Sequence, residues 1–279
     1  MLQEPFPCAA CVLQEPFPWH ISFCGDVDII GQQKAQARYR TVLWGQSQLE
    51  MAVHKPQGPD PRTHERIGSW GWPEEEQSWT WAGHEGADVQ VTVYAKDCCD
   101  SVALFFNDSK VSEQPVNYAS EYKVTFTQSY QPGVLKAVGM KGGNPAPGAT
   151  KEFKTAGAVA KLTVEADRAS LRADPNDLSF LTVSAFDAAG VPVPFAETEI
   201  TVSIAHGAAA KIVAVATGNP RDVSDVLAMT KKLWNGKALA IVQPLAAAAP
   251  GPVTVKVTAA GVPDVEVVVT TTASGYVSL

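Results

Sequence analysis

The sequence predicts a mainly β protein with two tandem immunoglobulin-like β-sandwiches, preceded by a short segment that contains one helix. From residue 49 onwards, apolar residues fall into short alternating runs rich in Val, Tyr and Phe, as in half-buried strands. Turn residues separate these runs, and the 21 glycines and 20 prolines of the chain supply many of them. The pattern restarts near residue 157, which indicates a second domain of the same class.

The one expected helix covers residues 32–44, a segment of good helix formers without Gly or Pro. Gly45 follows at the position of a C-terminal cap. We expect Tyr39, Val42 and Leu43 to form the buried side of this helix.

The strand runs of both sandwiches alternate with turn signals. A two-residue hairpin turn is expected at Asn107–Asp108, and a loop is expected at residues 142–149, which read GGNPAPGA. One strand is expected at residues 49–55, ahead of the first sandwich, and the expected strands of the first sandwich are residues 88–96, 101–108, 121–130, 133–140 and 150–157. Those of the second sandwich are residues 160–168, 178–187, 198–206, 210–217, 236–244, 251–261 and 265–272.

Charge and hydropathy exclude two classes of partner. The formal net charge is −7 and no basic run is present, whereas phosphate binding needs clustered Lys and Arg, so no nucleic acid is expected. No stretch approaches the roughly 18 apolar residues of a membrane-spanning helix, so no membrane partner is expected. The first residues, MLQEPFPCAAC, lack the cationic start and apolar run of a signal peptide, and the localisation stays unknown.

The five cysteines do not suggest a disulfide framework, because their number is odd and the pair Cys98–Cys99 is adjacent. Cys8 and Cys11, together with His20 and Cys24, could formally supply four zinc ligands. Their spacing fits no zinc finger, so the simpler interpretation is a set of reduced thiols. The sequence predicts no metal and no cofactor.

Four stretches resemble consecutive parts of the β-galactosidase-like enzymes of glycoside hydrolase family 2. The first resembles the end of the catalytic (β/α)8 barrel and reads PWHISFCGDVDIIG…ARYRTVLWG. The second resembles the connector that leaves the barrel and reads IGSWGWPEEEQSWTWAGHEG. The third is similar to the immunoglobulin-like domain that follows and reads VQVTVYAKDCCDSVALFFNDSK, and the fourth is similar to the last sandwich domain and reads LTVEADRASLRADPNDLSFLTVSAFDAAGVPVP with LWNGKALAIVQP.

These stretches occur in the family order over about residues 16–260. Together with the strand pattern, the resemblance implies four segments. They are a terminal barrel remnant with one helix (1–45), a strand and Trp-rich connector (46–86), an immunoglobulin-like sandwich (87–156) and a second such sandwich (157–279).

The resemblance implies a parent enzyme that hydrolyses O-glycosyl bonds with two glutamates, of which the acid/base is preceded by Asn. In the family both lie on earlier barrel strands, and this sequence contains no Asn-Glu pair. We therefore expect the chain alone to be inactive and to serve as a scaffold. Its implied partners are a β-galactoside-type carbohydrate in the parent enzyme, the missing catalytic barrel and, through exposed apolar surface, other copies of the chain.

Four tryptophans, Trp70, Trp72, Trp79 and Trp81, lie within twelve residues of the connector. They are either an exposed platform on which sugar rings stack, or anchors that pin an irregular connector to the domains beside it. The position in the seam between domains favours the anchors. An exposed platform would instead support a different function, that of a stand-alone carbohydrate-binding or adhesion module.

Four further residues near the start are candidates for carbohydrate contact. Trp19 and His20 would face the sugar cleft of a parent enzyme, as the resemblance implies. Asp26 and Asp28 are two residues apart, and paired carboxylates invite an acid/base interpretation. The favoured alternative is that they bond loop amides or cap the helix, since glycosidic carboxyls must lie across a sugar.

Two acidic groups are expected to have no chemical role. Glu74–Glu76 is expected to be a solvated turn. Asp174, Asp177 and Asp187 could bind an ion between loops, but acidic residues of surface turns are the commoner explanation.

Overall fold

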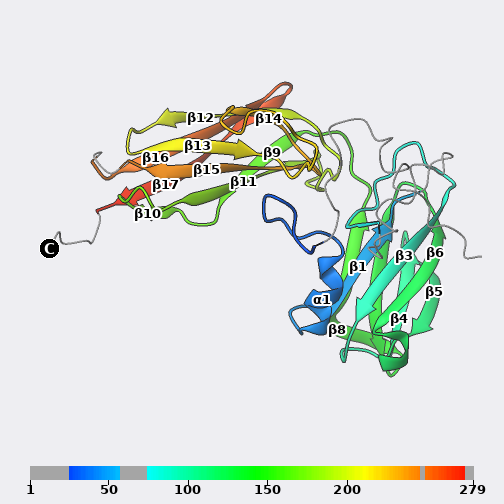
Figure 1. The fold of residues 1–279 in the computed structure, drawn as a ribbon. Coiled ribbons are helices and arrows are strands. Elements are labelled where there is room, and N and C mark those ends of the chain that lie inside the picture. The colour runs from blue at the N-terminus through cyan, green and yellow to red at the C-terminus, as the bar shows by residue number, and fades with distance from the viewer. Residues whose placement is uncertain (1–24, 57–73, 246–248, 274–279) are drawn as a thin grey trace, which may run out of the picture.

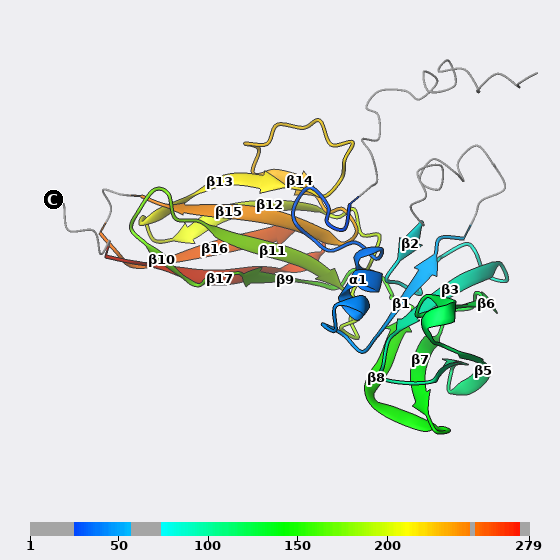
Figure 2. The same ribbon diagram turned by 60° about the horizontal axis from the view of Figure 1, so that its bottom comes forward.

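The structure is a computed structural model and describes residues 25–56, 74–245 and 249–273. Two β-sandwiches follow one another along the chain, and the helix α1 (Ala37–Leu43) lies where they meet (Figures 1 and 2). This confirms the predicted class, a mainly β protein of tandem immunoglobulin-like sandwiches. No helix among the described residues is long and apolar enough to cross a membrane.

The first sandwich consists of two four-stranded antiparallel sheets, with the strand orders β2-β1-β3-β6 and β5-β4-β7-β8. A 3-10 turn at Tyr118–Ser120 connects the two sheets. The strands are β1 (Leu49–His54), β2 (Glu75–Glu76), β3 (Asp88–Ala95), β4 (Ser101–Phe106), β5 (Ser109–Pro115), β6 (Lys123–Ser129), β7 (Val134–Lys141) and β8 (Asn144–Lys154).

The second sandwich pairs a five-stranded sheet, β10-β17-β16-β12-β14, with a four-stranded sheet, β13-β15-β11-β9. Its pairings are antiparallel except that of β10 with β17. The strands are β9 (Lys161–Ala166), β10 (Ser170–Arg172), β11 (Ser179–Phe186), β12 (Glu199–His206), β13 (Ala210–Ala216), β14 (Thr230–Lys232), β15 (Lys237–Pro244), β16 (Pro252–Ala259) and β17 (Val262–Thr272).

Each sandwich has its own apolar core between its sheets. In the first, alternate residues of β1 and β3 point inward, and Met51, Val53 and Val91 are fully buried. In the second, Leu181 and Val255 occupy equivalent inward positions. Apolar and polar residues alternate in the sequence because successive strand residues face opposite sides of a sheet, as the prediction assumed.

The structure corrects the prediction in the N-terminal half. The helix begins at Ala37 and not at residue 32, because the backbone N–H of Lys34 bonds the carbonyl of Asp26 (2.8 Å) within a preceding loop. Strands β1 and β2 pair within the first sheet, so the first sandwich draws two strands from residues 46–86, where one strand and a connector outside the sandwich were expected.

The expected loop at residues 142–149 was also wrong. Only Gly142 and Gly143 form a turn, with φ values of 57° and 80°, and β8 begins directly after them. Pro145 and Pro147 are compatible with this strand because β8 lies at the edge of its sheet, where fewer backbone N–H groups are needed for pairing. The strands β5, β10 and β14 were missed, since β5 is mostly exposed and β10 and β14, of three residues each, are too short to show an alternation.

We predict that Gly236→Ala destabilises the second sandwich far more than Gly261→Ala. Both glycines have positive φ, 71° and 77°, so both substitutions strain the backbone. A Cβ on Gly236 would also lie 2.3 Å from the carbonyl oxygen of Val193, whereas a Cβ on Gly261 meets open space.

The expected losses in the free energy of unfolding are about 3–4 kcal/mol for Gly236→Ala and about 1–2 kcal/mol for Gly261→Ala. Urea denaturation followed by circular dichroism would measure both. Equal losses would show that the contact with Val193 does not matter.

Candidate functional site

Asp26 and Asp28 lie in the loop before helix α1, called the N-terminal loop below, and their carboxylates accept hydrogen bonds that hold this loop in place. Asp28 Oδ1 accepts hydrogen bonds from the backbone N–H groups of Ile30 (3.0 Å) and Gln32 (2.8 Å). Asp26 Oδ1 accepts from the Arg40 guanidinium at 2.7 Å. Both carboxylates thus hold local structure, as the favoured interpretation of the sequence proposed.

The same loop touches the second sandwich. A Cβ on Gly218 would lie 2.5 Å from Asp28 Oδ2, so the absence of a side chain there permits the approach. Lys237 on β15 donates from Nζ to Gln32 Oε1 at 2.9 Å. Burial lowers the pKa of Lys237, while the negative charge of Asp28 opposes this change. These contacts fix the N-terminal loop on the sheet β13-β15-β11-β9.

Trp79 and Trp81 lie inside the protein. Trp79 is 0% exposed, donates its indole N–H to the carbonyl of Gln131 (2.9 Å) and packs edge-on against Tyr130 with ring centroids 5.1 Å apart. Trp81 is 4% exposed, and its ring lies 5.1 Å from that of Phe195 in the second sandwich. Their burial favours the anchoring role over a sugar-stacking platform.

Four of the predicted carbohydrate contacts fall outside the residues that the structure describes. They are Trp19, His20, Trp70 and Trp72, and their role in carbohydrate contact stays a prediction.

A buried polar cluster beside helix α1 is the site that the sequence did not indicate. Glu75 was expected in a solvated turn but is only 4% exposed. Its carboxylate accepts the one hydroxyl proton of Tyr94, whose oxygen lies 2.7 and 2.9 Å from the two carboxylate oxygens, and it lies 3.1 Å from His54 Nε2. His54 Nε2 also lies 3.1 Å from the Thr92 hydroxyl.

The outer face of strands β1 and β3 produces this cluster. Inward positions of both strands are apolar, so His54, Thr92 and Tyr94 fall on the opposite face, which α1 covers. Glu75 of β2 pairs with His54 across the same sheet. Tyr39 of the helix packs against Tyr94 with the rings tilted by 37° and their centroids 5.1 Å apart. Burial, and secondly the charge of Glu75, raise the pKa of Tyr94 and keep its phenol protonated as a donor.

Two further glutamates, Glu50 and Glu76, lie on the same strands as this cluster. Glu50, 5% exposed, pairs with Lys151 Nζ at 2.8 Å. Removal from water raises the pKa of Glu76 to about 7, and the nearby charge of Glu74 adds to the rise while Lys55 opposes it. The buried charge of the cluster thus joins strands of the first sandwich, and the carboxylates of Glu50 and Glu75 are held by protein groups.

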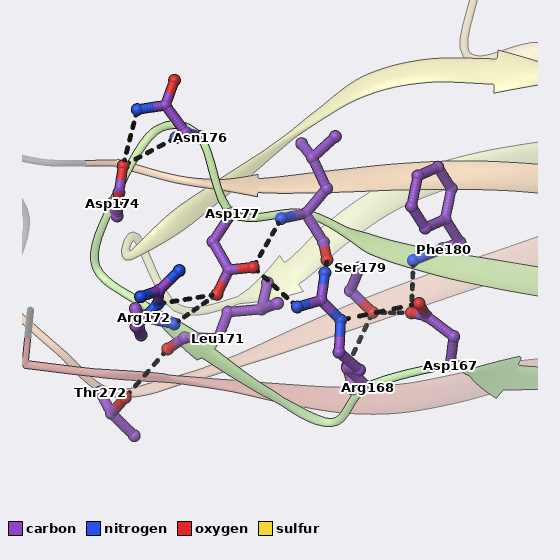
Figure 3. Close-up of polar contacts among 11 residues, drawn as sticks. Asp167, Arg168, Leu171, Arg172, Asp174, Asn176, Asp177, Ser179, Phe180 and Thr272 are labelled. Carbon is purple, nitrogen blue, oxygen red and sulfur yellow. Dashed lines mark hydrogen bonds and ion pairs between the residues drawn. The ribbon is translucent and has the colours of Figure 1, made fainter.

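A second polar network lies in the second sandwich, around Asp177 (Figure 3). Asp177 is 8% exposed and accepts from the Arg172 backbone N–H (2.9 Å) and the Arg168 guanidinium (2.8 Å). These donors lower its pKa, the Arg172 N–H most strongly. Asp174 accepts from the backbone and side chain of Asn176 in the adjoining turn.

Asp187 has the same kind of role between the two sandwiches. It is 6% exposed and accepts from the backbone N–H groups of Gly157 (2.9 Å) and Val191 (2.8 Å), which lower its pKa. Three or more His, Cys, Asp or Glu side chains never gather into a metal-binding group within the described ranges. The network and Asp187 therefore organise turns.

Comparison with known proteins relates both sandwiches to one enzyme family. Residues 162–268 match the family model of the glycoside hydrolase family 2 C-terminal domain 5, and residues 86–146 match a domain of unknown function, DUF4982. The chain is 27% identical over 165 residues to β-galactosidase BoGH2A of Bacteroides ovatus, which covers 59% of this chain and 18% of that protein.

Solved structures show the same relationship. A glycosyl hydrolase family 2 member from Bacteroides cellulosilyticus DSM 14838 has a TM-score of 0.76 and 27% identity, covering 88% of this chain and 32% of that one. A β-glycosidase from Bacteroides vulgatus, 21% identical with a TM-score of 0.70 over 88% of this chain and 28% of its own, shares the fold. This chain therefore spans less than two thirds of the length of these relatives.

The fold and these matches relate the chain to the C-terminal sandwich domains of glycoside hydrolases. Specifically, residues 162–268 match a C-terminal domain of glycoside hydrolase family 2, and the chain is similar to a β-galactosidase and to other enzymes of that family.

We predict that Trp79→Ala lowers the free energy of unfolding by about 3–5 kcal/mol, because it removes a fully buried ring. Trp44→Ala is the matched control, since Trp44 is 70% exposed, and a change within about 0.5 kcal/mol is expected. Chemical denaturation would measure both variants. A small loss at Trp79 would contradict the anchoring role.

We also predict a pH-dependent stability that originates at Glu76. Its folded-state pKa of about 7 exceeds the ordinary 4.5, so the folded state binds the proton more tightly. The resulting stabilisation is complete below about pH 4.5 and is lost as the pH rises through 7.

Between pH 5 and pH 8, Glu76 should cost the unmodified chain on the order of 2–3 kcal/mol in free energy of unfolding. The variant Glu76→Gln should not show this part of the decrease. Denaturation curves across this range would measure the difference. Glu266→Gln, on an exposed strand position, controls for the removal of one charge. Parallel pH profiles for Glu76→Gln and the unmodified chain would contradict the assignment.

Proposed function

We propose that this chain is the non-catalytic C-terminal scaffold of a β-galactosidase-like family 2 enzyme. The parent would hydrolyse O-glycosyl bonds of a β-galactoside-type carbohydrate. The proposal rests on the carboxylates of the N-terminal loop and of strands β1 and β2 that bond to the protein's own groups. Asp26, Asp28, Glu50 and Glu75 each bond protein groups, whereas retaining glycosidases need two carboxyls about 5–5.5 Å apart across an open sugar site.

Exposed apolar side chains on the N-terminal segment support a scaffold role. Val27, Ile29 and Trp44 are 54%, 69% and 70% exposed, although they flank a well-packed helix. Large apolar side chains left exposed on one segment are compatible with a contact with another protein domain. We propose the catalytic barrel of the parent as that domain, and self-association as the consequence when the barrel is absent.

We predict that the native product is several times larger than the 29.6 kDa of this chain. An antibody raised against residues 157–260 would show its size on an immunoblot of the source cells. The scaffold proposal requires a large band, because the barrel must be present on the same polypeptide. A single band at 29.6 kDa would contradict it.

Activity of the isolated chain provides the complementary control. The chain, produced in a host without β-galactosidase, should not hydrolyse an aryl β-galactoside. Turnover that survives the double substitution Asp26→Asn and Asp28→Asn would show a catalytic site elsewhere in the chain and would overturn the non-catalytic role.

A further inference from the structure

A cavity of about 310 Å³ lies where the N-terminal loop meets the outer face of the sheet β13-β15-β11-β9. This volume is at the lower end of the roughly 300–1,000 Å³ of small-molecule sites. The lining residues come from the loop and from strands β9, β11 and β15, with Asp167 directly after β9. They are Ile30, Gln32, Glu165, Ala166, Asp167, Phe180, Thr182 and Leu239.

The floor of the cavity is a row of cross-strand neighbours. Thr182 on β11 pairs with Glu165 on β9 at one side and with Leu239 on β15 at the other. Phe180 lies two residues before Thr182 on the same face and is 37% exposed. The floor thus combines an aromatic side chain, an aliphatic side chain, a hydroxyl and a carboxylate.

The wall of the cavity is held in place before any ligand binds. The two bonds that Asp28 accepts fix the backbone at Ile30 and Gln32. Lys237 donates to Gln32 Oε1, which orients the amide and leaves its Nε2 group as a hydrogen-bond donor. A wall that is already ordered avoids the entropy cost of ordering it on binding.

Two polar groups of the floor make no hydrogen bond or ion pair within the described part of the chain, the exposed Glu165 carboxylate and the half-buried Thr182 hydroxyl. The charge of Glu165 acts on Lys237 at longer range. Asp167, by contrast, is fixed, since its Oδ1 accepts from the Phe180 N–H at 2.7 Å (Figure 3). Polar groups that the fold does not use, gathered at a concave surface beside an aromatic ring, are typical of a small-molecule site.

We propose that this cavity binds a neutral saccharide of one or two pyranose rings. A pyranose has an apolar C–H face that packs on an aromatic ring and hydroxyl edges that both donate and accept hydrogen bonds. Phe180 and Leu239 would contact the face, while Glu165, Thr182 and Gln32 would bond the hydroxyls. The carboxylates of Glu165 and Asp167 disfavour an anionic ligand by repulsion.

The saccharide site is independent of the proposed scaffold function, since it needs no catalytic barrel. A chain that forms part of a larger glycosidase could use it to hold a substrate chain away from the active centre. A chain that acts alone could use it for carbohydrate attachment.

The test is a titration of the full chain, labelled with ¹⁵N, with galactose, lactose, cellobiose and maltose in separate NMR experiments. Saturable shifts of the amides of Thr182 and Glu165 are expected with at least one of the four sugars. Phe180→Ala should weaken that binding roughly tenfold. Thr182→Val, which keeps the side-chain shape, should weaken it roughly 2- to 10-fold.

Tyr118→Ala is the matched control, because Tyr118 is an 82% exposed aromatic residue of the first sandwich. This variant should bind like the unmodified chain. The proposal is overturned if none of the four sugars produces saturable shifts at these amides, or if binding is unchanged in both Phe180→Ala and Thr182→Val. The amide spectrum of each variant shows whether it is folded.

Discussion

The buried carboxylate of Glu75 is the contact on which the arrangement of the first sandwich depends. It ties the two-residue strand β2 to Tyr94 of β3 and to His54 of β1, while Tyr39 of the helix covers the tyrosine. A buried carboxylate without partners would cost several kcal/mol, so these elements are stable only together. Helix α1 therefore packs on the outer face of a sheet that would otherwise be exposed to water.

The second constraint is the packing of the N-terminal loop on the second sandwich. Asp28 closes the loop, and the loop meets the sheet through Gly218 and the bond from Lys237 to Gln32. Trp81 against Phe195 supplies an apolar contact between the two sandwiches. The two domains are therefore joined through side chains as well as through the chain itself, which is the property that a scaffold needs.

The sequence predicted the fold class and most strands, because alternation reports the buried face directly. It did not predict the polar edge strand β5, whose residues are mostly exposed, and it took the first half of β8, residues 144–149, for a loop because of its glycine and prolines. The candidate site was harder. Asp26 and Asp28 were named with their local role, but the burial of Glu75 arises from pairing with His54 and Tyr94, which are about twenty residues away in either direction. The run of three glutamates at Glu74–Glu76 contains no local signal that distinguishes a solvated turn from a buried, hydrogen-bonded carboxylate.

The N-terminal loop has two sides, and this explains how one segment can serve both proposed roles. Ile30 is 8% exposed and, with Gln32, faces the cavity on the second sandwich, whereas Val27 and Ile29 are exposed. The Asp28 turn fixes both sets of side chains at once, because its hydrogen bonds set the backbone between them. A domain docked on the exposed apolar side would leave the cavity side open. Contact with a barrel and binding of a saccharide would therefore use different sides of the loop and would not compete. A change in the Asp28 turn would disturb both contacts.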